Sequence, residues 1–257
     1  MSIIKGYGFT EGPIKHMMRS EVIRHATNRF DIYGKRDLSM FTLPADSLIV
    51  EKQLHEYYGD RLSLFGVEKE KAVYSKAKKI IKALDLPMKL TLESDVDFWA
   101  KNKEEFNLIW LDYCGPFCHT KKEVLSNIAQ GDHLKISKKQ SAILAITLLD
   151  TLDLWSIEEL RLVVQKDAKK EGWKNEKLNY MARLGGVPKL LNDEARKAGN
   201  TLRPLISYRY VDKLRNKKAC PMRLFICEVE KGIHKYNVWN TPSMDLESDI
   251  ANSIRKV

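Results

Sequence analysis

The residues with the clearest capacity for chemistry follow a short apolar run in the middle of the chain. Residues 108–111 are apolar throughout, and Asp112, Tyr113 and a Gly-Pro pair at 115–116 come after them. The run has the length of one buried strand, and Gly-Pro predicts a turn. An open α/β sheet commonly places its ligand where such a strand delivers polar groups to a turn. The alternative is an ordinary core strand with a polar end.

The elements around this stretch alternate between strand and helix patterns. From residue 38 onward, short apolar runs bounded by Gly or Pro alternate with segments of helical period. Five strand–helix repeats with short connections predict right-handed crossovers and a mostly parallel, doubly wound sheet. The predicted strands are residues 38–43, 61–67, 88–92, 108–111 and 141–149, and the helices that follow the first, second and fourth are residues 48–58, 71–84 and 120–130.

The rest of the chain extends this pattern at both ends. Residues 14–30 form a predicted helix in an N-terminal extension, 1–37, and residues 38–257 form one domain. A capping box at Ser156 opens a helical segment, 156–200, whose second helix is interrupted near Gly185-Gly186 and Pro188. Two closing strands follow at residues 202–211 and 222–229, and the tail beyond residue 231 is weakly patterned.

Composition excludes several classes of protein. The chain has 257 residues, of which 44% are hydrophobic, enough for the core of one large α/β domain. No apolar run approaches the length of a membrane span, and the N-terminus lacks the apolar centre of a signal peptide. Four unevenly spaced cysteines indicate a reducing cytoplasm rather than a disulfide framework. We expect a cytoplasmic protein with no membrane contact that is a monomer by default.

The net charge of +10 is concentrated in one segment. Residues 161–218 contain 16 Lys and Arg against 6 Asp and Glu, which leaves 28 of each sign in the remainder. A concentrated basic surface is the electrostatic footprint expected for a polyanion such as nucleic acid. The alternative is a lysine-rich solvated surface without a partner.

The order of the predicted elements resembles that of class I S-adenosylmethionine-dependent methyltransferases. In that family the last strand inserts antiparallel into an otherwise parallel sheet of seven, and the resemblance covers about residues 38–229. It implies a seven-stranded, mostly parallel, Rossmann-like sheet with helices on both faces. The basic helical segment would then be an elaboration between strands five and six. It also implies S-adenosylmethionine as the cofactor.

The same resemblance implies roles for three acids. Glu68, directly after the second strand, would bind the ribose hydroxyls, because a carboxylate offers the two acceptors that a vicinal diol needs. Asp95, or next Asp97, would meet the adenine amino group after the third strand. Acids at strand ends also cap helices, and this alternative stays open.

The loop after the first strand departs from the family pattern. The family has acid-x-Gly-x-Gly there, so that the backbone can approach the methionine part of the cofactor. Residues 42–47 contain no glycine; Pro44, Ala45 and Asp46 stand in its place, and Asp46 would bind the methionine ammonium. The missing glycines favour an alternative function, a catalytically degenerate methyltransferase fold that binds nucleic acid or a protein without methyl transfer.

The motif at residues 112–117 resembles the Asp-Pro-Pro-Tyr loop of methyltransferases that act on amino groups of nucleic-acid bases. The match is partial, because no proline follows Asp112 directly. The resemblance implies that Asp112 accepts the N–H bonds of a base amine, while Tyr113 or Phe117 stacks on the base. A nucleophilic Cys114 is a weaker hypothesis, because Cys is more often a small buried residue. A metal bound by residues 114–119 is also weaker, since a closed zinc site needs four ligands. We predict no metal.

Overall fold

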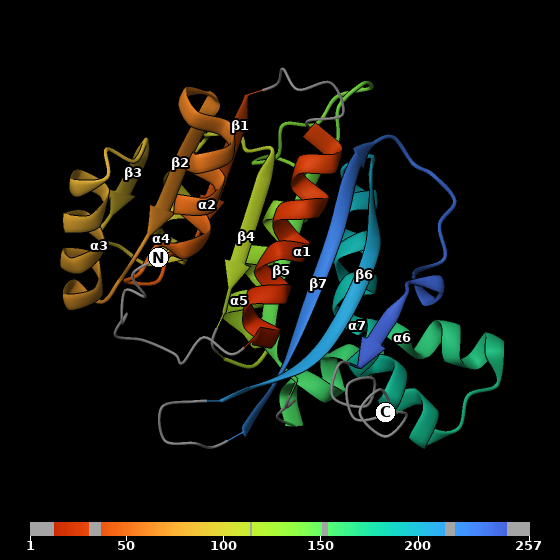
Figure 1. Ribbon diagram of the computed structural model, residues 1–257. Coiled ribbons are helices and arrows are strands. Elements are labelled where there is room, and N and C mark those ends of the chain that lie inside the picture. Colours follow the sequence, from red (N-terminus) through yellow and green to blue (C-terminus); the bar gives the residue numbers. More distant parts are fainter. Residues whose placement is uncertain (1–12, 31–36, 114, 151–153, 214–218, 246–257) are drawn as a thin grey trace, which may run out of the picture.

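One mixed sheet of eight strands, with helices on both faces, organises the structure (Figure 1). This is a computed structural model, and it describes residues 13–30, 37–113, 115–150, 154–213 and 219–245. The strand order is β3-β2-β1-β4-β5-β7-β6-β8. Strand β7 is antiparallel to both of its neighbours, whereas the other adjacent pairs are parallel.

The elements have the following bounds. The strands are β1 Leu38–Thr42, β2 Leu62–Val67, β3 Met88–Thr91, β4 Leu108–Asp112, β5 Ala142–Leu149, β6 Asn200–Lys213, β7 Ala219–Lys231 and β8 Ser243–Asp245. The helices are α1 Pro13–Phe30, α2 Ile49–Tyr58, α3 Lys71–Ala83, α4 Asp95–Lys101, α5 His119–Gln130, α6 Leu154–Glu171 and α7 Asn175–Lys197, with short 3-10 turns η1 Gly59–Arg61 and η2 Val238–Asn240.

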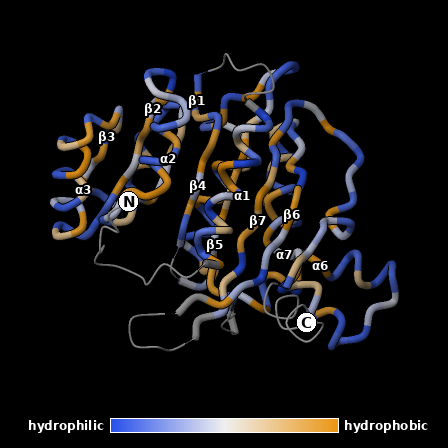
Figure 2. Tube along the Cα trace, viewed as in Figure 1, coloured by the Kyte–Doolittle hydropathy of each residue, from blue (hydrophilic) through white to orange (hydrophobic). Residues whose placement is uncertain are grey.

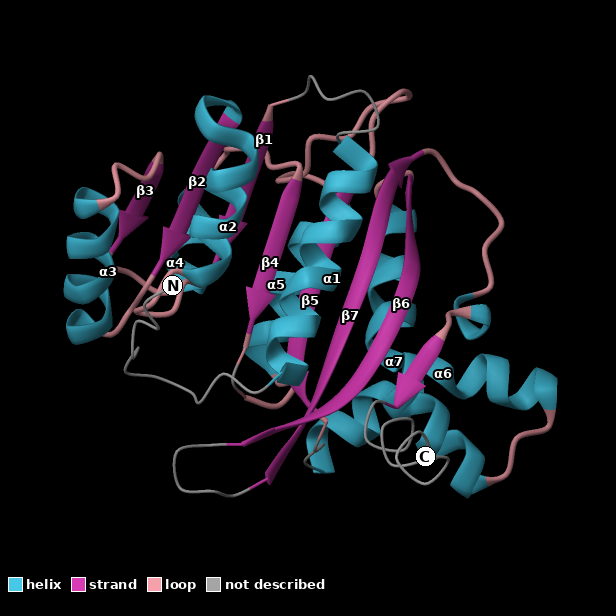
Figure 3. Cartoon of the chain, viewed as in Figure 1, coloured by secondary structure: helices cyan, strands magenta, loops and turns pink. Residues whose placement is uncertain are grey.

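Two layers of helices cover the two faces of the sheet (Figure 3). Helices α1, α2 and α3 pack on one face, and α4, α5 and α7 pack on the other, with α6 against α7. Figure 2 shows the apolar residues concentrated in the strands and on the inner sides of the helices. Central strands β4 and β5 are covered on both faces, which is why their sequences are apolar almost throughout.

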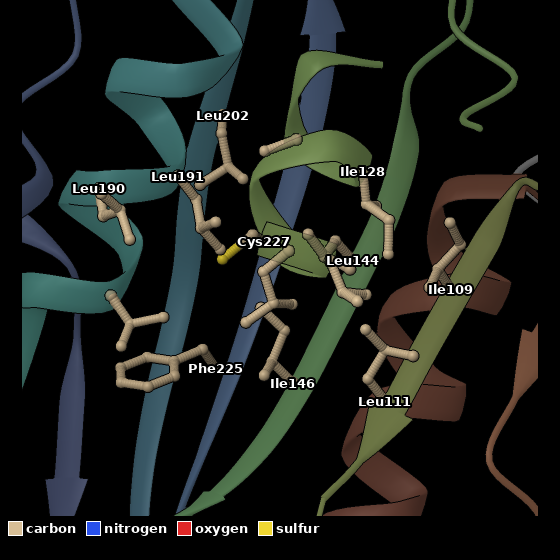
Figure 4. Close-up of a cluster of buried hydrophobic side chains, with 14 of the residues drawn as sticks. Ile109, Leu111, Ile128, Leu144, Ile146, Leu190, Leu191, Leu202, Phe225 and Cys227 are labelled. Atoms are coloured by element: carbon tan, nitrogen blue, oxygen red, sulfur yellow. The ribbon is translucent and has the colours of Figure 1, made fainter. Parts of the chain in front are cut away.

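The core on the α5–α7 face combines aliphatic and aromatic side chains. Figure 4 shows Leu144 and Ile146 of β5 between residues of helix α5, helix α7 and strand β7. Cys227 lies within this cluster, and burial raises the pKa of its thiol far above the ordinary range. It is therefore a small core residue rather than a reactive thiol.

Most of the predicted elements are present within one or two residues of their expected bounds. The seven expected strands occur, with the last one antiparallel, but β8 adds an eighth. It is only three residues long and polar, so no apolar pattern signalled it. The sequence predicts no helix after the third strand, whereas β3 is followed by helix α4. Ser94 caps it by accepting the backbone N–H of Asp97, so the polar residues start a helix rather than end a strand.

The predicted interruption of the second basic helix was wrong, because α7 continues through Pro188. Its two glycines serve close packing instead of a break. A Cβ at Gly185 would lie 2.7 Å from the Trp239 ring, and one at Gly186 would lie 3.0 Å from Cβ of Leu160. The glycines therefore let α6 and the C-terminal segment approach α7 closely.

Helix α1 is part of the core on its face of the sheet. Met18, Val22 and Ala26 are buried there against the sheet and α2. The remainder of the predicted N-terminal extension, residues 1–12 and 31–36, lies outside the described residues, as do Cys114 and residues 214–218 of the basic segment.

Candidate functional site

Parallel strands bring the predicted site residues to one edge of the sheet. β1 pairs in parallel with β2 and β4, and β2 with β3, so their carboxyl ends share one edge. Thr42 ends β1, Glu68 directly follows β2, Asp112 ends β4 and Asp95 begins α4 just after β3. The strand order reverses between β1 and β4, which is the position where open α/β sheets bind ligands.

The loop after β4 is held by contacts that the sequence did not reveal. Lys121, in the first turn of α5, donates to the Pro116 carbonyl at 2.5 Å. The Ser156 hydroxyl donates to the Phe117 carbonyl, also at 2.5 Å, and the Gly115 carbonyl accepts the N–H of Leu149 at 3.2 Å. Donors from α5, α6 and β5 therefore fix the path of the motif.

Tyr113 points inward from this loop. Its hydroxyl donates to Oδ2 of Asp95 at 2.6 Å, and its ring is only 8% exposed. The Lys121 ammonium lies 4.9 Å from the ring centroid, a cation–π distance. Burial and then the Asp95 charge raise the pKa of the Tyr113 hydroxyl well above its usual value. Tyr113 is therefore neutral and serves as a donor.

The other two residues of the predicted catalytic set differ in accessibility. Phe117 is fully buried among the core side chains of its face, so its ring offers no surface to a base in this conformation. Asp112 is partly exposed at the end of β4. Of the two aromatic candidates for stacking, only Tyr113 lies at the sheet edge, and its ring faces Asp95 rather than solvent.

A buried acid beside Asp112 was missed at the sequence level. Glu51, in the first turn of α2, is 3% exposed. Burial and, to a smaller extent, the charge of Asp112 raise the pKa of the Glu51 carboxyl. Its own backbone N–H, the Thr42 hydroxyl and Arg19 lower it, but the net pKa is raised. The available signal was helical spacing, because Glu51 shares the buried face of α2 with Leu54 and Tyr58.

The loop after β1 turns without a glycine. Leu48 carries the left-handed conformation, with φ 48° and ψ 43°, although its side chain is fully buried. That conformation is costly for a residue with a Cβ. The buried side chain of Leu48 anchors the loop in the core on the α2 face, which offsets the backbone strain.

The three residues of this turn that were expected to contact the cofactor differ in exposure and in contacts; they are Pro44, Ala45 and Asp46. Pro44 is buried against β2, where a Cβ at Gly66 would lie 3.1 Å from Cδ of the proline. Ala45 is exposed, and Asp46 forms an ion pair with Lys76 of α3 at 3.5 Å. The absence of a side chain at Gly66 therefore leaves room for Pro44 and Met88.

Glu68 and Asp97 both take part in local capping. Oε1 of Glu68 accepts the backbone N–H of Glu70 at 2.7 Å. Asp97 accepts the Ser94 hydroxyl at 2.7 Å, completing the cap of α4. A carboxylate has about four lone-pair sites, so Glu68, which is partly exposed, retains acceptors for a diol.

The surroundings of Glu68 fit the ribose of S-adenosylmethionine, whereas those of Asp95 do not fit the adenine. Glu68 has free acceptor capacity where the ribose is expected. At the expected adenine position, Asp95 also retains acceptor sites, but the buried Tyr113 ring, whose hydroxyl bonds to Asp95, leaves no space for adenine between β4 and α4. The adenine end therefore does not fit in this conformation.

The basic segment separates into two parts in the structure. The arginines of β6 are paired with acids: Arg203 with Glu228 and Glu230, and Arg209 with Asp150 and Asp245. The α6–α7 arm, defined here as residues 161–183, is hydrophilic along its outer part (Figure 2). Its exposed basic residues are Lys166, Lys169, Lys170, Lys174, Lys177 and Arg183. Among the residues of the basic segment whose side chains the structure describes, the exposed basic ones are therefore concentrated on the arm.

Neither a metal cluster nor a membrane-spanning helix occurs in the described ranges. No group of three or more His, Cys, Asp or Glu side chains there is arranged to hold a metal ion. Among the same residues, no helix combines the length and apolar character needed to cross a membrane.

No protein-family model matches this sequence, and no curated protein matches it either. Solved structures do resemble it. A Galdieria sulphuraria protein provisionally named a sarcosine dimethylglycine methyltransferase shares 12% identity over 85% of this chain and 86% of its own, with TM-score 0.46. A Clostridium thermocellum protein provisionally named an rRNA methylase shares 11% over 82% and 97%, with TM-score 0.45. Precorrin-6y C5,15-methyltransferase from Geobacter metallireducens GS-15 shares 11% over 87% and 93%, with TM-score 0.46.

At such scores these structures identify no substrate, and the assignment of the fold rests on the strand order itself. Five parallel strands in the order 3-2-1-4-5, followed by an antiparallel β7 between β5 and β6, give the arrangement expected of a methyltransferase sheet. The chain has a Rossmann-like methyltransferase fold with an additional edge strand.

Proposed function

We propose that this protein is an S-adenosylmethionine-dependent methyltransferase that acts on nucleic acid, at a base amino group. The observation that carries the proposal is the convergence of Glu68, Asp95 and Asp112 on one edge of this sheet, at its switch point. The exposed lysines of the α6–α7 arm support a polyanionic substrate.

In this proposal the residues of the chain bind and orient rather than react covalently. The cofactor, when bound, supplies a methyl group already activated on a sulfonium. Glu68 accepts hydroxyl hydrogen bonds, and the partly exposed Asp112 accepts N–H bonds of the target amine and so fixes its direction. The donors from Lys121 and Ser156 keep the Asp112 loop in place.

Calorimetric titration with S-adenosylmethionine, with and without RNA or DNA, tests the proposal. We expect Glu68→Ala to weaken cofactor binding, and Asp112→Asn to abolish methyl transfer with cofactor affinity largely retained. Absence of binding to the wild type under both conditions would sink the enzyme function. Equal loss of affinity in both variants would mean that the roles are assigned wrongly.

The nucleic-acid contact has its own test on the α6–α7 arm. Binding should weaken steeply with added salt, and Lys170→Glu with Lys174→Glu should reduce the salt slope by about two. The matched control is Lys79→Glu with Lys82→Glu on α3, since these lysines are also exposed but lie at the other end of the sheet. An equal effect of both pairs would count against a site on the arm.

A second function is favoured by a specific observation. Pro44 packs on Gly66 and Tyr113 occupies Asp95, as expected if the fold had lost its cofactor and bound nucleic acid or a protein without methyl transfer. Binding of nucleic acid in the absence of any cofactor binding would favour this alternative.

A further inference from the structure

The bond between Tyr113 and Asp95 joins two segments that follow different strands of the edge at which the acids converge. Tyr113 follows β4, and Asp95 follows β3. In the sheet, β1 and β2 lie between these two strands. Helix α4 packs against α5, in the same buried cluster as Tyr113, and this packing brings Asp95 within reach of the Tyr113 hydroxyl.

The ring of Tyr113 is itself buried beside this bond. It belongs to the same buried cluster as Phe41, Trp99 and Phe117, and Lys121 lies over it. At 8% exposure, the ring leaves little room for a second planar group between β4 and α4. The crevice expected at this edge of an open sheet is thus occupied by the chain itself.

The hydroxyl also satisfies the chemistry expected of a ligand. A Tyr O–H and an exocyclic amine N–H are both donors that a carboxylate accepts. Asp95 receives at 2.6 Å, from Tyr113, the kind of bond that the adenine amino group was expected to make.

We infer that Tyr113 closes the adenine end of the candidate cofactor site, so that an adenosine group binds only after the Tyr113 hydroxyl leaves Asp95. This inference rests on the proposed function and describes the regulation of that site. The affinity of the wild type is then reduced by the fraction of molecules in which the site is closed.

The test compares two tyrosines that make the same bond. Tyr113→Phe keeps the ring and removes the hydroxyl, and Tyr113→Ala removes the ring. The matched control is Tyr208→Phe, because the Tyr208 hydroxyl donates to Glu21 at 2.7 Å and its ring is 5% exposed, but it joins β6 to α1. Each protein is titrated calorimetrically with S-adenosylmethionine, adenosine and methionine.

We expect Tyr113→Phe to bind S-adenosylmethionine and adenosine roughly tenfold more tightly than the wild type, since a hydrogen bond to a charged group no longer has to break. Tyr113→Ala should gain at least as much. Methionine affinity should not change, and Tyr208→Phe should stay within about twofold for every probe. Urea unfolding and near-ultraviolet circular dichroism establish that each variant is folded; if Tyr113→Ala is not, Tyr113→Phe decides.

The outcomes separate this inference from the proposed function. If the wild type binds S-adenosylmethionine and Tyr113→Phe binds it equally or more weakly, the closure is refuted and the methyltransferase proposal stands. If no folded variant binds S-adenosylmethionine or adenosine, even with nucleic acid present, both fail. If only the Tyr113 variants bind S-adenosylmethionine, the closure is supported, whereas the enzyme function proposed for the wild type fails.

Discussion

Two buried glutamates, one in strand β7 and one in helix α2 over the other half of the sheet, have oppositely shifted pKa values. Glu51 and Glu228 are 3% and 2% exposed. Glu228, on β7, accepts from Ser141 at 2.6 Å and pairs with Arg29 at 2.6 Å and with Arg203. Burial alone raises the pKa of the Glu228 carboxyl, but these partners outweigh burial and the net pKa is lowered.

Glu51 lies in helix α2, over the other half of the sheet, and the pKa of its carboxyl is raised. Burial is again the largest cause, and Thr42 and Arg19 do not offset it, partly because Asp112 places a second negative charge nearby. The two carboxyls have similarly small exposure, but their pKa values shift in opposite directions. The charge of Glu228 is therefore compensated by its partners, whereas that of Glu51 is compensated only in part. Perturbed carboxyls beside a strand end mark functional sites more often than fully paired acids do. Glu51 therefore identifies the same edge as Asp112.

The largest expected effect is on stability, at Glu228. Glu228→Gln removes the charge that two arginines share, and we expect the free energy of unfolding to fall by about 2 to 3 kcal/mol. Urea denaturation measures this. Glu230→Gln is the matched control: its carboxyl is more exposed and lies 3.5 Å from Arg203, so about 1 kcal/mol or less is expected. Equal losses would contradict the structural role of Glu228.

The pH dependence of stability should have opposite signs at the two sites. The stabilisation from Glu228 is complete above its ordinary pKa of 4.5 and is lost as pH falls through the lower folded-state pKa. Glu51, with a raised folded-state pKa, destabilises the protein increasingly as pH rises from 4.5 to that pKa. The free energy of unfolding of the wild type and of both Gln variants, measured between pH 3 and 8 in steps of about one pH unit, checks this. Parallel curves would refute the contrast.

The smallest expected effect is from Glu51→Gln at neutral pH. The amide keeps an acceptor for Thr42 and removes an unfavourable buried charge, so we expect a change within about 1 kcal/mol in either direction. Arg19→Met is the companion variant, since it removes the opposing charge and should destabilise more than Glu51→Gln. Urea unfolding at pH 7 compares the two. A loss at Glu51 as large as that at Glu228 would end the distinction between the sites.

Much of the architecture could be predicted because hydrophobic periodicity and Gly/Pro breakers are local signals. The five parallel strands and the closing pair follow from them. The edge strand β8 and helix α4 could not, since a three-residue polar strand is selected by its neighbour and Ser94 acts as a cap only once the helix forms. The role of the α7 glycines could not be predicted either, because their close packing with Trp239 and Leu160 involves residues distant in the chain, which no local pattern encodes.

At the candidate site, the amino-acid sequence determined which groups stand at the strand ends, because strand boundaries place Glu68 and Asp112 at an edge whatever else the chain does. Tertiary structure alone decided what those groups contact. Tyr113 reaches an acid 18 residues away, and Glu51 meets side chains from three other elements. Such pairings depend on helix packing and on burial, which change hydrogen bonds and pKa values without leaving a pattern along the chain.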